Sequence, residues 1–376
     1  MRERVRHILI KEFIQVFRDP RMRFTIFVPP LMQMILLGYA VTTDVKHVAL
    51  GVHDLDHTVA SRELVARFVG SGYFDVVEHP QNENAVQDSL DRSRVRAILR
   101  IPRGFQERWE SGRTAPLQLL VDGTDSNTAS VVLQYSSRIT AQLSEKAFSE
   151  RLQRRLGRPP QLGSVQLQTR AWFNENLESR LYYVPGVIAM IVTMVTLMLS
   201  SMAMVREKEM GTIEQIMVTP IRPMEFILGK TLPFALISFM DVLLISLVGI
   251  FWFQVPLRGS PLWLFFGTAL YLMSTLGIGL LISSVSQTQQ QVMMTTTFFY
   301  MPAVLLSGLV FPIANMPQVV QWLTFLNPMR YFLVIIRGIF LKGVGPAILW
   351  PEMLALAILG ITTLWMAARQ FRKTLA

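Results

Sequence analysis

The chain has 376 residues, of which 51% are hydrophobic and only 16% are charged, and it contains no cysteine. The absence of cysteine excludes disulfides, thiolate metal sites and a cysteine nucleophile. The formal net charge of +10 lies mainly on segments that flank apolar runs, whereas residues 43–180 are nearly balanced. This distribution favours a membrane protein with one polar domain over a nucleic-acid-binding protein.

Residues 1–23 predict a cytoplasmic amphipathic helix that lies along the membrane surface. Their apolar side chains recur at three- and four-residue steps, and basic residues border them. These apolar positions are Val5, Ile8, Leu9, Phe13, Val16 and Phe17. Pro20 is expected to end the helix. An ordinary basic flank without a defined helix is the alternative.

Residues 24–43 predict the first transmembrane helix, because this uncharged run has about the 20 residues that a hydrocarbon core requires. A cleavable signal peptide is the rival interpretation, since Gly38-Tyr39-Ala40 has the pattern of a cleavage site. The basic region before the run is too long for a signal peptide, and Pro29-Pro30 breaks the apolar stretch. A retained helix is therefore favoured.

Residues 44–180 predict a separate α/β domain, because charges of both signs, turn residues and short alternating runs replace the apolar sequence. The expected strands are residues 48–52, 73–78, 95–101, 117–121 and 165–173, and the expected helices are residues 61–69, 85–90, 105–110 and 128–156.

Residues 181–376 predict a domain of five further transmembrane helices. The apolar runs are residues 183–204, 226–253, 262–282, 292–310 and 347–368. Prolines break residues 311–342, which predicts two short helices that dip into the outer leaflet. The expected fold class is an α-helical membrane protein with six transmembrane helices and an α/β extracytoplasmic domain between the first two.

The distribution of Lys and Arg predicts the orientation. Residues 1–23, 205–230 and 369–376 carry seven, four and three basic residues, and the positive-inside rule places them in the cytoplasm. Both termini are then cytoplasmic and residues 44–180 lie outside. A multi-pass protein of the bacterial inner membrane fits this pattern.

The sequence offers little catalytic chemistry. His53 and His57 stand close to Asp54 and Asp56, but Asp is common in turns for its local hydrogen bonds, so a metal site is not expected. Gly229-Lys230-Thr231 resembles the end of a P-loop, yet Met224 stands where the leading glycine belongs. We expect this chain to bind no ATP and no metal.

Asp241 is the ionisable residue near the middle of a predicted span. A charge at that depth is costly, so the side chain should face the bundle interior or a cavity. It could contact a substrate or a partner subunit, or it could accept hydrogen bonds from a neighbouring helix. The sequence leaves these alternatives open.

Residues 205–220 predict a short amphipathic cytoplasmic helix that could dock in a groove of a partner protein, although a solvated turn is equally compatible. The stretch resembles the coupling loop of ABC-2-type permeases of ABC transporters. The residues that carry this resemblance are Arg206, Glu207, Glu209, Gly211, Thr212, Glu214 and Pro220. Residues 205–225 would form the whole loop.

The same family is indicated elsewhere in the chain. Asn327-Pro328-x-Arg330-Tyr331 resembles the outer re-entrant segment of these permeases. Asp54-x-Asp56, Ile101-Pro102-x-Gly104-Phe105 and the run Val121–Asn127 resemble the multidrug-export branch, which has a large periplasmic domain. The neutral stretch Gln287–Gln291 adds little to the resemblance.

The resemblance implies a permease subunit that exports an amphiphilic, drug-like or lipid-like compound with energy from a separate ATP-binding cassette subunit. That subunit would hold the ATP and Mg²⁺, and the coupling residues would contact it. A second permease chain, a periplasmic adaptor protein and membrane lipids are the other expected partners. The main alternative is an ion-coupled secondary transporter, for which only Asp241 and Lys230 could supply coupling groups.

Overall fold

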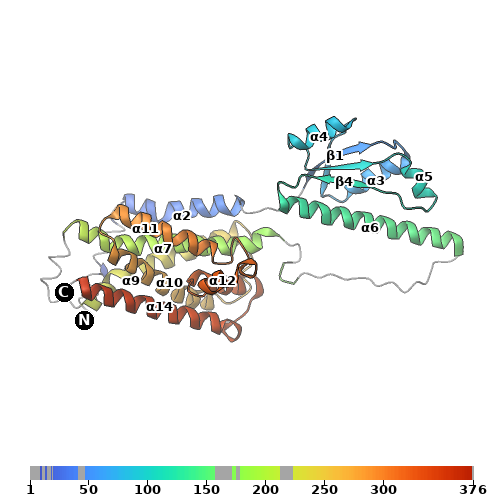
Figure 1. Cartoon of the computed structure of the whole chain (residues 1–376). Helices are drawn as coiled ribbons and strands as arrows, with labels where there is room; N and C mark the ends of the chain where they lie inside the picture. The colour runs from blue at the N-terminus through green and yellow to red at the C-terminus, as the bar shows by residue number, and fades with distance from the viewer. Residues whose placement is uncertain are drawn as a thin grey trace. The chain divides into compact units, whose positions relative to one another are not determined.

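The computed structural model describes residues 9–10, 13–14, 18, 20–40, 47–156, 172–174, 178–211 and 223–374. The chain divides into two compact units, which Figure 1 shows with their helices and strands. The sheet unit comprises residues 44–169, and the helical unit comprises residues 1–43 together with 170–376.

A four-stranded sheet forms the centre of the sheet unit, in the spatial order β2-β1-β3-β4. Its strands are β1 (Val48–Asp54), β2 (Phe74–Glu78), β3 (Ala97–Ile101) and β4 (Gln118–Val121). β1 pairs in parallel with β2 and β3, and β4 is antiparallel to β3. The parallel pairs require crossover helices, and these are α3 (Val59–Gly70) and α4 (Glu83–Asp91).

Alternate side chains of a strand point to opposite faces of the sheet, and in this unit hydrophobic residues pack against both faces. On one face Leu50 and Leu99 pack in a core with Phe68 of α3. Two more helices, α5 (Phe105–Glu110) and α6 (Ser126–Leu156), supply Phe105 and Val132 to the same core. On the other face Ile98 packs with Val86 of α4 and with Val95.

The four strands predicted between residues 48 and 121 all form. The fifth, at residues 165–173, lies outside the described residues except for Trp172 and Phe173, which form a bend. The alternation of strand and helix therefore follows the prediction over residues 48–156.

The helical unit contains long apolar helices and a region of short ones. The long helices are α2 (Pro20–Ala40), α7 (Ser179–Glu209), α9 (Pro223–Phe251), α10 (Pro261–Val285), α11 (Gln289–Leu305) and α14 (Pro346–Thr374). The short ones are η1 (Ile313–Asn315), α12 (Gln318–Thr324), α13 (Pro328–Arg337) and η2 (Gly338–Lys342).

Four helices of the described part are long and apolar enough to cross a membrane, namely α7, α10, residues 231–251 of α9 and residues 346–370 of α14. α12 and the pair α13–η2 meet at a bend of 76°. The apolar part of α2, Ile26–Ala40, and the 17-residue α11 are shorter than the roughly 20 residues expected for a span. A mostly helical protein with several membrane-length helices is thus confirmed, whereas the number of crossings stays a prediction.

Two predicted boundaries and one predicted break are wrong. α11 ends at Leu305 rather than at residue 310, because the chain turns there and Gly308 takes a φ of +85°. α7 continues through Glu209, so the loop predicted to begin at residue 205 begins later. Pro29 and Pro30 lie inside α2 and do not interrupt it.

α10 packs along α7 and α14, and small residues permit the close approach. A Cβ at Gly279 would lie 1.8 Å from Ser200 Oγ of α7, and a Cβ at Gly277 would lie 2.3 Å from Thr363 Oγ1 of α14. Glycine is therefore required at both contacts.

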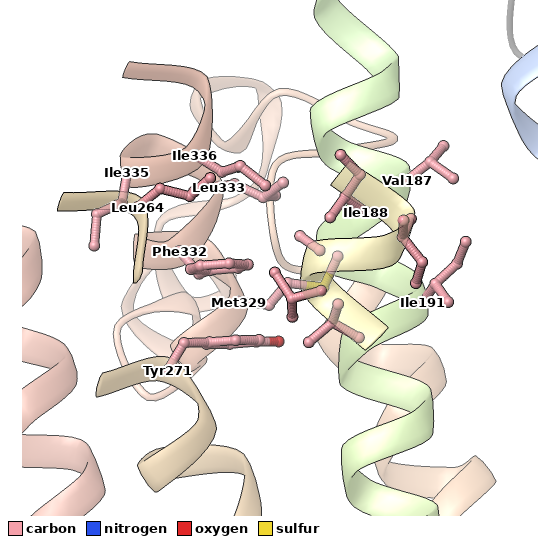
Figure 2. Close-up of a cluster of buried hydrophobic side chains, with 14 of the residues drawn as sticks. Val187, Ile188, Ile191, Leu264, Tyr271, Met329, Phe332, Leu333, Ile335 and Ile336 are labelled. Carbon is pink, nitrogen blue, oxygen red and sulfur yellow. The ribbon is translucent and has the colours of Figure 1, made fainter. Parts of the chain in front are cut away.

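An aromatic pair joins α10 to the short helices. Tyr271 stacks on Phe332 of α13 with ring centroids 4.2 Å apart, and its hydroxyl forms a hydrogen bond with Thr193 of α7. Figure 2 shows this pair with Met329 and Ile188 nearby in one buried cluster. α7, α10 and α13 thus share one core.

Candidate functional site

The end of α7 carries four of the predicted coupling residues. Arg206, Glu207 and Glu209 lie in its last turns, and Gly211 follows with a φ of +69°. Glycine adopts this left-handed conformation without strain, so it suits the end of a helix. Glu207 is buried, Arg206 is half-buried and Glu209 is exposed. The other predicted coupling residues, Thr212, Glu214 and Pro220, lie outside the described residues.

Lys208, which sequence reasoning did not select, binds the end of α10. Its Nζ donates hydrogen bonds to the carbonyl oxygens of Ser283, Ser284 and Ser286 at 3.0, 3.1 and 3.0 Å. The last carbonyls of a helix have no partner within the helix and carry a partial negative charge. The ammonium group therefore caps the C-terminus of α10.

Glu209 binds the start of α11 in the same way with the opposite charge. The backbone N–H of Gln289 donates to Glu209 Oε1 at 2.7 Å, and the side-chain amide of Gln289 donates to the other carboxylate oxygen. Gln289 is the first residue of α11, where backbone N–H groups lack helical partners. The stretch Gln287–Gln291, which adds little to the family resemblance, thus contacts a predicted coupling residue.

The predicted re-entrant residues build the bend between α12 and α13. Asn327 Oδ1 accepts from the backbone N–H of Met329 at 3.1 Å, and Asn327 Nδ2 donates to the carbonyl of Ala303 in α11 at 2.7 Å. One buried side chain thus caps α13 and tethers it to α11. Pro328 occupies the first position of α13, where its missing N–H costs nothing.

Arg330 and Tyr331 close the bend from the other side. The Arg330 guanidinium lies over the ring of Phe325, 4.1 Å from its centroid, and it donates to the Thr324 hydroxyl. The Tyr331 hydroxyl donates to the carbonyl of Phe325 at 3.0 Å. All four residues of the motif therefore stabilise this turn.

A groove of about 830 Å³ runs along α10 between α11 and α14, and the α12–α13 bend forms one end of it. Most of its lining is apolar, with Phe299 and Pro302 from α11 and Trp365 from α14. Arg369 lies near the other end, 5.3 Å above the ring of Trp365. The groove thus offers an apolar surface with a cation at one end.

Asp241 lies on the buried face of α9 with 1% of its surface exposed. Neither carboxylate oxygen has a hydrogen-bond partner among the described residues. Asp241 does not line the groove. The structure therefore separates Asp241 from the groove.

The sequence model described as "ABC-2 family transporter protein" matches residues 20–369. The chain belongs to this family. It is 33% identical to the probable multidrug ABC transporter permease YbhR of Escherichia coli K12, over 97% of each chain. It is 32% identical to the probable multidrug ABC transporter permease YbhS of the same organism, over 98% of this chain and 97% of that one. The inner membrane transport permease YhhJ is 28% identical over 97% and 96%.

The P-loop-like sequence of this ABC-2 family member lies in a helix. Gly229 and Thr231 are buried within α9, which runs without interruption from Pro223 to Phe251. A phosphate-binding loop requires a turn between a strand and a helix, so that backbone N–H groups can face the phosphates. Gly229 and Thr231 therefore lack the strand-to-helix turn of a phosphate-binding loop.

The aspartates of the sheet unit have structural partners. Asp54 accepts hydrogen bonds from the backbone of Asp56 and from Ser61 Oγ. Asp56 accepts from three backbone N–H groups at the start of α5, at 2.7 to 3.1 Å. Burial raises the pKa of Asp56, but the hydrogen bonds from Thr58 and from this backbone outweigh it and leave the pKa below its ordinary value.

The Asp54-x-Asp56 motif and the glycine-containing motif that follows β3 are thus joined by the carboxylate of Asp56. No group of three or more potential metal ligands occurs in the part of the chain that the structure describes. The carboxylate of Asp56 thus links the turn after β1 to the start of α5.

Proposed function

We propose that the chain is the membrane permease subunit of an ABC exporter that moves an amphiphilic compound outward with ATP hydrolysed by a separate subunit. The observation that carries the proposal is the relation to permeases over 97% of the chain, including two named as probable multidrug transporters. The placement of Gly229 and Thr231 inside a helix supports a separate source of ATP hydrolysis.

The proposed topology has six crossings, cytoplasmic termini and the sheet unit in the periplasm of a bacterial inner-membrane protein. An aromatic cluster at the ends of α2 and α9 supports it, because aromatic side chains concentrate at membrane interfaces. Trp252 Nε1 donates to the Tyr39 hydroxyl at 3.0 Å, and the Tyr39 ring lies 5.4 Å from that of Phe253. Both helix ends are the ones assigned to the outer surface.

The proposed partner contact comprises the end of α7 and the rest of residues 205–225, with Arg206, Glu207 and Gly211 among its residues. The ATP-binding cassette subunit would carry ATP and Mg²⁺, and a second permease chain would complete the transporter. A periplasmic adaptor bound to the sheet unit is proposed by analogy with the multidrug branch.

The groove along α10 supports an amphiphilic substrate. Its α10 side extends from Thr275 to Val285, a rise of about 15 Å, or half of a hydrocarbon core. Arg369 would hold a polar or anionic head near the cytoplasmic surface while the apolar part lies between α11 and α14. Such a compound could enter from the inner leaflet.

The test is ATPase activity of the chain reconstituted with its ATP-binding subunit. Gly211→Ala should reduce substrate-stimulated ATPase activity severalfold, because an L-residue at a φ of +69° is strained by about 1–2 kcal/mol and redirects the chain into the coupling loop. Glu214→Lys should have a larger effect through charge reversal at the proposed interface. Membrane insertion should persist in both.

The matched control is Gly72→Ala. Gly72 also follows a helix end and has a φ of +74°, and, as at Gly211, no atom of the described residues lies within 4 Å of the added Cβ. Its variant should keep full stimulation. Equal stimulation in all variants would refute the coupling role, and transport driven by a proton gradient without ATP would favour the secondary transporter.

A further inference from the structure

Two neighbouring residues of opposite charge hold the two helix ends that flank one short turn. Lys208 donates to three carbonyl oxygens at the C-terminus of α10, and Glu209 accepts from the backbone and side chain of Gln289 at the N-terminus of α11. The cation meets the negative end of one helix dipole and the anion meets the positive end of the next. We call this arrangement the Lys208–Glu209 brace.

The turn between α10 and α11 is short and is held by local hydrogen bonds. Only Ser286, Gln287 and Thr288 separate the two helices. Thr288 Oγ1 accepts from the backbone N–H of Gln291, and the Gln291 side chain accepts from the backbone N–H of Gln287. These groups of the turn are thus bonded locally, and the brace supplies its attachment to α7.

Closer to the membrane centre, α7 also contacts both helices. Gly279 of α10 approaches Ser200 of α7 too closely for any Cβ. Thr296 Oγ1 of α11 donates to Ser201 Oγ at 3.4 Å. A displacement of the end of α7 therefore cannot leave α10 and α11 behind without breaking the five hydrogen bonds of the brace and disrupting this packing.

We infer that Lys208 and Glu209 are positioning residues that make the α10–α11 turn move with the end of α7, so that motion imposed by the ATP-binding subunit reaches three helices. The inference rests on the proposed function, which supplies that motion. It assigns Glu209 an internal role in place of a contact with the partner subunit.

The absence of cysteine allows a direct test with the double variant Glu209→Cys and Gln289→Cys in the reconstituted complex. Without a link, substrate stimulation of ATPase activity should fall at least fivefold. A short, reducible bifunctional thiol reagent should restore stimulation to within twofold of the native level, and a reductant should abolish it again. A link within the chain could not replace a lost contact with the partner.

A second arm tests Lys208. Lys208→Met should lower stimulation severalfold, whereas Lys208→Arg should retain it because the guanidinium still donates to the α10 carbonyls. Glu209→Cys with Gln254→Cys controls for non-specific linking. Gln254 follows the end of α9 at which Gly249 lies against Val184 of α7. Val184 stands 25 residues before Glu209 on the same helix, which corresponds to about 37 Å along the helix axis. This pair should not link.

The outcomes separate the two proposals. A native complex without stimulation refutes the proposed function and the inference together. If the native complex is stimulated but the double variant at Glu209 and Gln289 stays inactive once it is linked, the inference alone is refuted. Failure of that variant to link, or full stimulation in its unlinked form, refutes the inference in the same way.

Discussion

The sheet unit and the helical unit differ in how many of their buried polar side-chain atoms lack a hydrogen-bond partner among the described residues. Of the buried side-chain nitrogen and oxygen atoms without a hydrogen-bond partner in the described residues, two belong to the sheet unit and nine to the helical unit. In the sheet unit the half-buried carboxylate of Asp56 accepts hydrogen bonds from three backbone N–H groups, whereas in the helical unit the buried carboxylate of Asp241 has no partner among the described residues. The sheet unit therefore leaves fewer buried polar side-chain atoms without a partner than the helical unit does, and such atoms can be satisfied by protonation, a ligand or another chain.

The largest effect should follow from disturbing the close packing that holds the helical unit. Gly277→Ala places a Cβ 2.3 Å from Thr363 Oγ1 and 2.9 Å from the Leu364 backbone nitrogen. The backbone of α14 at Leu364 cannot move aside at a small energetic cost, so we expect a loss of about 3 kcal/mol in the free energy of unfolding. Thermal unfolding in detergent measures it. Gly345→Ala, where the added Cβ meets nothing within 4 Å, should leave the melting temperature unchanged. Equal melting of the two variants would contradict this account.

A smaller loss should follow from removing the hydrogen-bonded carboxylate of Asp56 in the sheet unit. We expect residues 44–180, expressed alone in the periplasm, to be soluble and folded. In this fragment Asp56→Ala should lower stability by about 2 kcal/mol at neutral pH, because the start of α5 loses its acceptor. Asp75→Ala is the control, since its partner is the exposed His47, and it should cost little.

The pH dependence of this loss has a definite sign. Because folding lowers the pKa of Asp56, its stabilisation is fully present above the unfolded value, near 3.8, and is lost as the pH falls through the folded pKa. Urea unfolding from pH 7 downward should show the native and variant fragments converging below that unfolded value. A gap that stays constant into strong acid would rule out the carboxylate as its source.

A still smaller effect is expected at a buried amide whose hydrogen bonds the helical unit does satisfy. Asn327→Ala removes the cap of α13 and the bond to Ala303, and should cost about 1–2 kcal/mol. Asn315→Ala is the control because Asn315 is exposed in η1. The difference in melting temperature between these variants measures the tether. No difference would mean that the bend holds without it.

The smallest change should come from Asp241→Asn. A charged carboxylate at membrane depth costs on the order of 2.5–3.5 kcal/mol on insertion scales, and the native residue has no hydrogen bond to lose among the described residues. Stability should therefore be unchanged or rise, in contrast to the loss expected for Asp56→Ala. A large loss of thermal stability would reveal a partner for Asp241 and weaken the comparison between the units.

The sequence predicted the elements better than their contacts. Alternating apolar residues located β1 and β3, and long apolar runs located α7, α9 and α10, because the burial of side chains is recorded in the local sequence pattern. Asp241 was expected on a buried face because lipid penalises its charge. Helix ends were less predictable. The last residues of α7, Lys208 and Glu209, bind the ends of α10 and α11, and these contacts are not visible in the local sequence.

The brace itself could not be predicted from local patterns. Lys208 and Ser283 are separated by 75 residues, and Gln289 lies in a stretch without charge or apolar periodicity. The only signal was the adjacency of opposite charges in Lys208–Glu209, which is common on any exposed helix. Similarly, the asparagine–proline motif predicted a bend, but the bond from Asn327 to Ala303 required the packed structure.

Transport by purified components tests the central claim most directly. Proteoliposomes that contain this chain and its ATP-binding subunit should expel a fluorescent amphiphile only when ATP and Mg²⁺ are supplied on the side of residues 205–225, and the chain alone should expel none. Transport by the chain alone under a proton gradient, or labelling of residues 205–220 from the face that carries the sheet unit, would contradict the account.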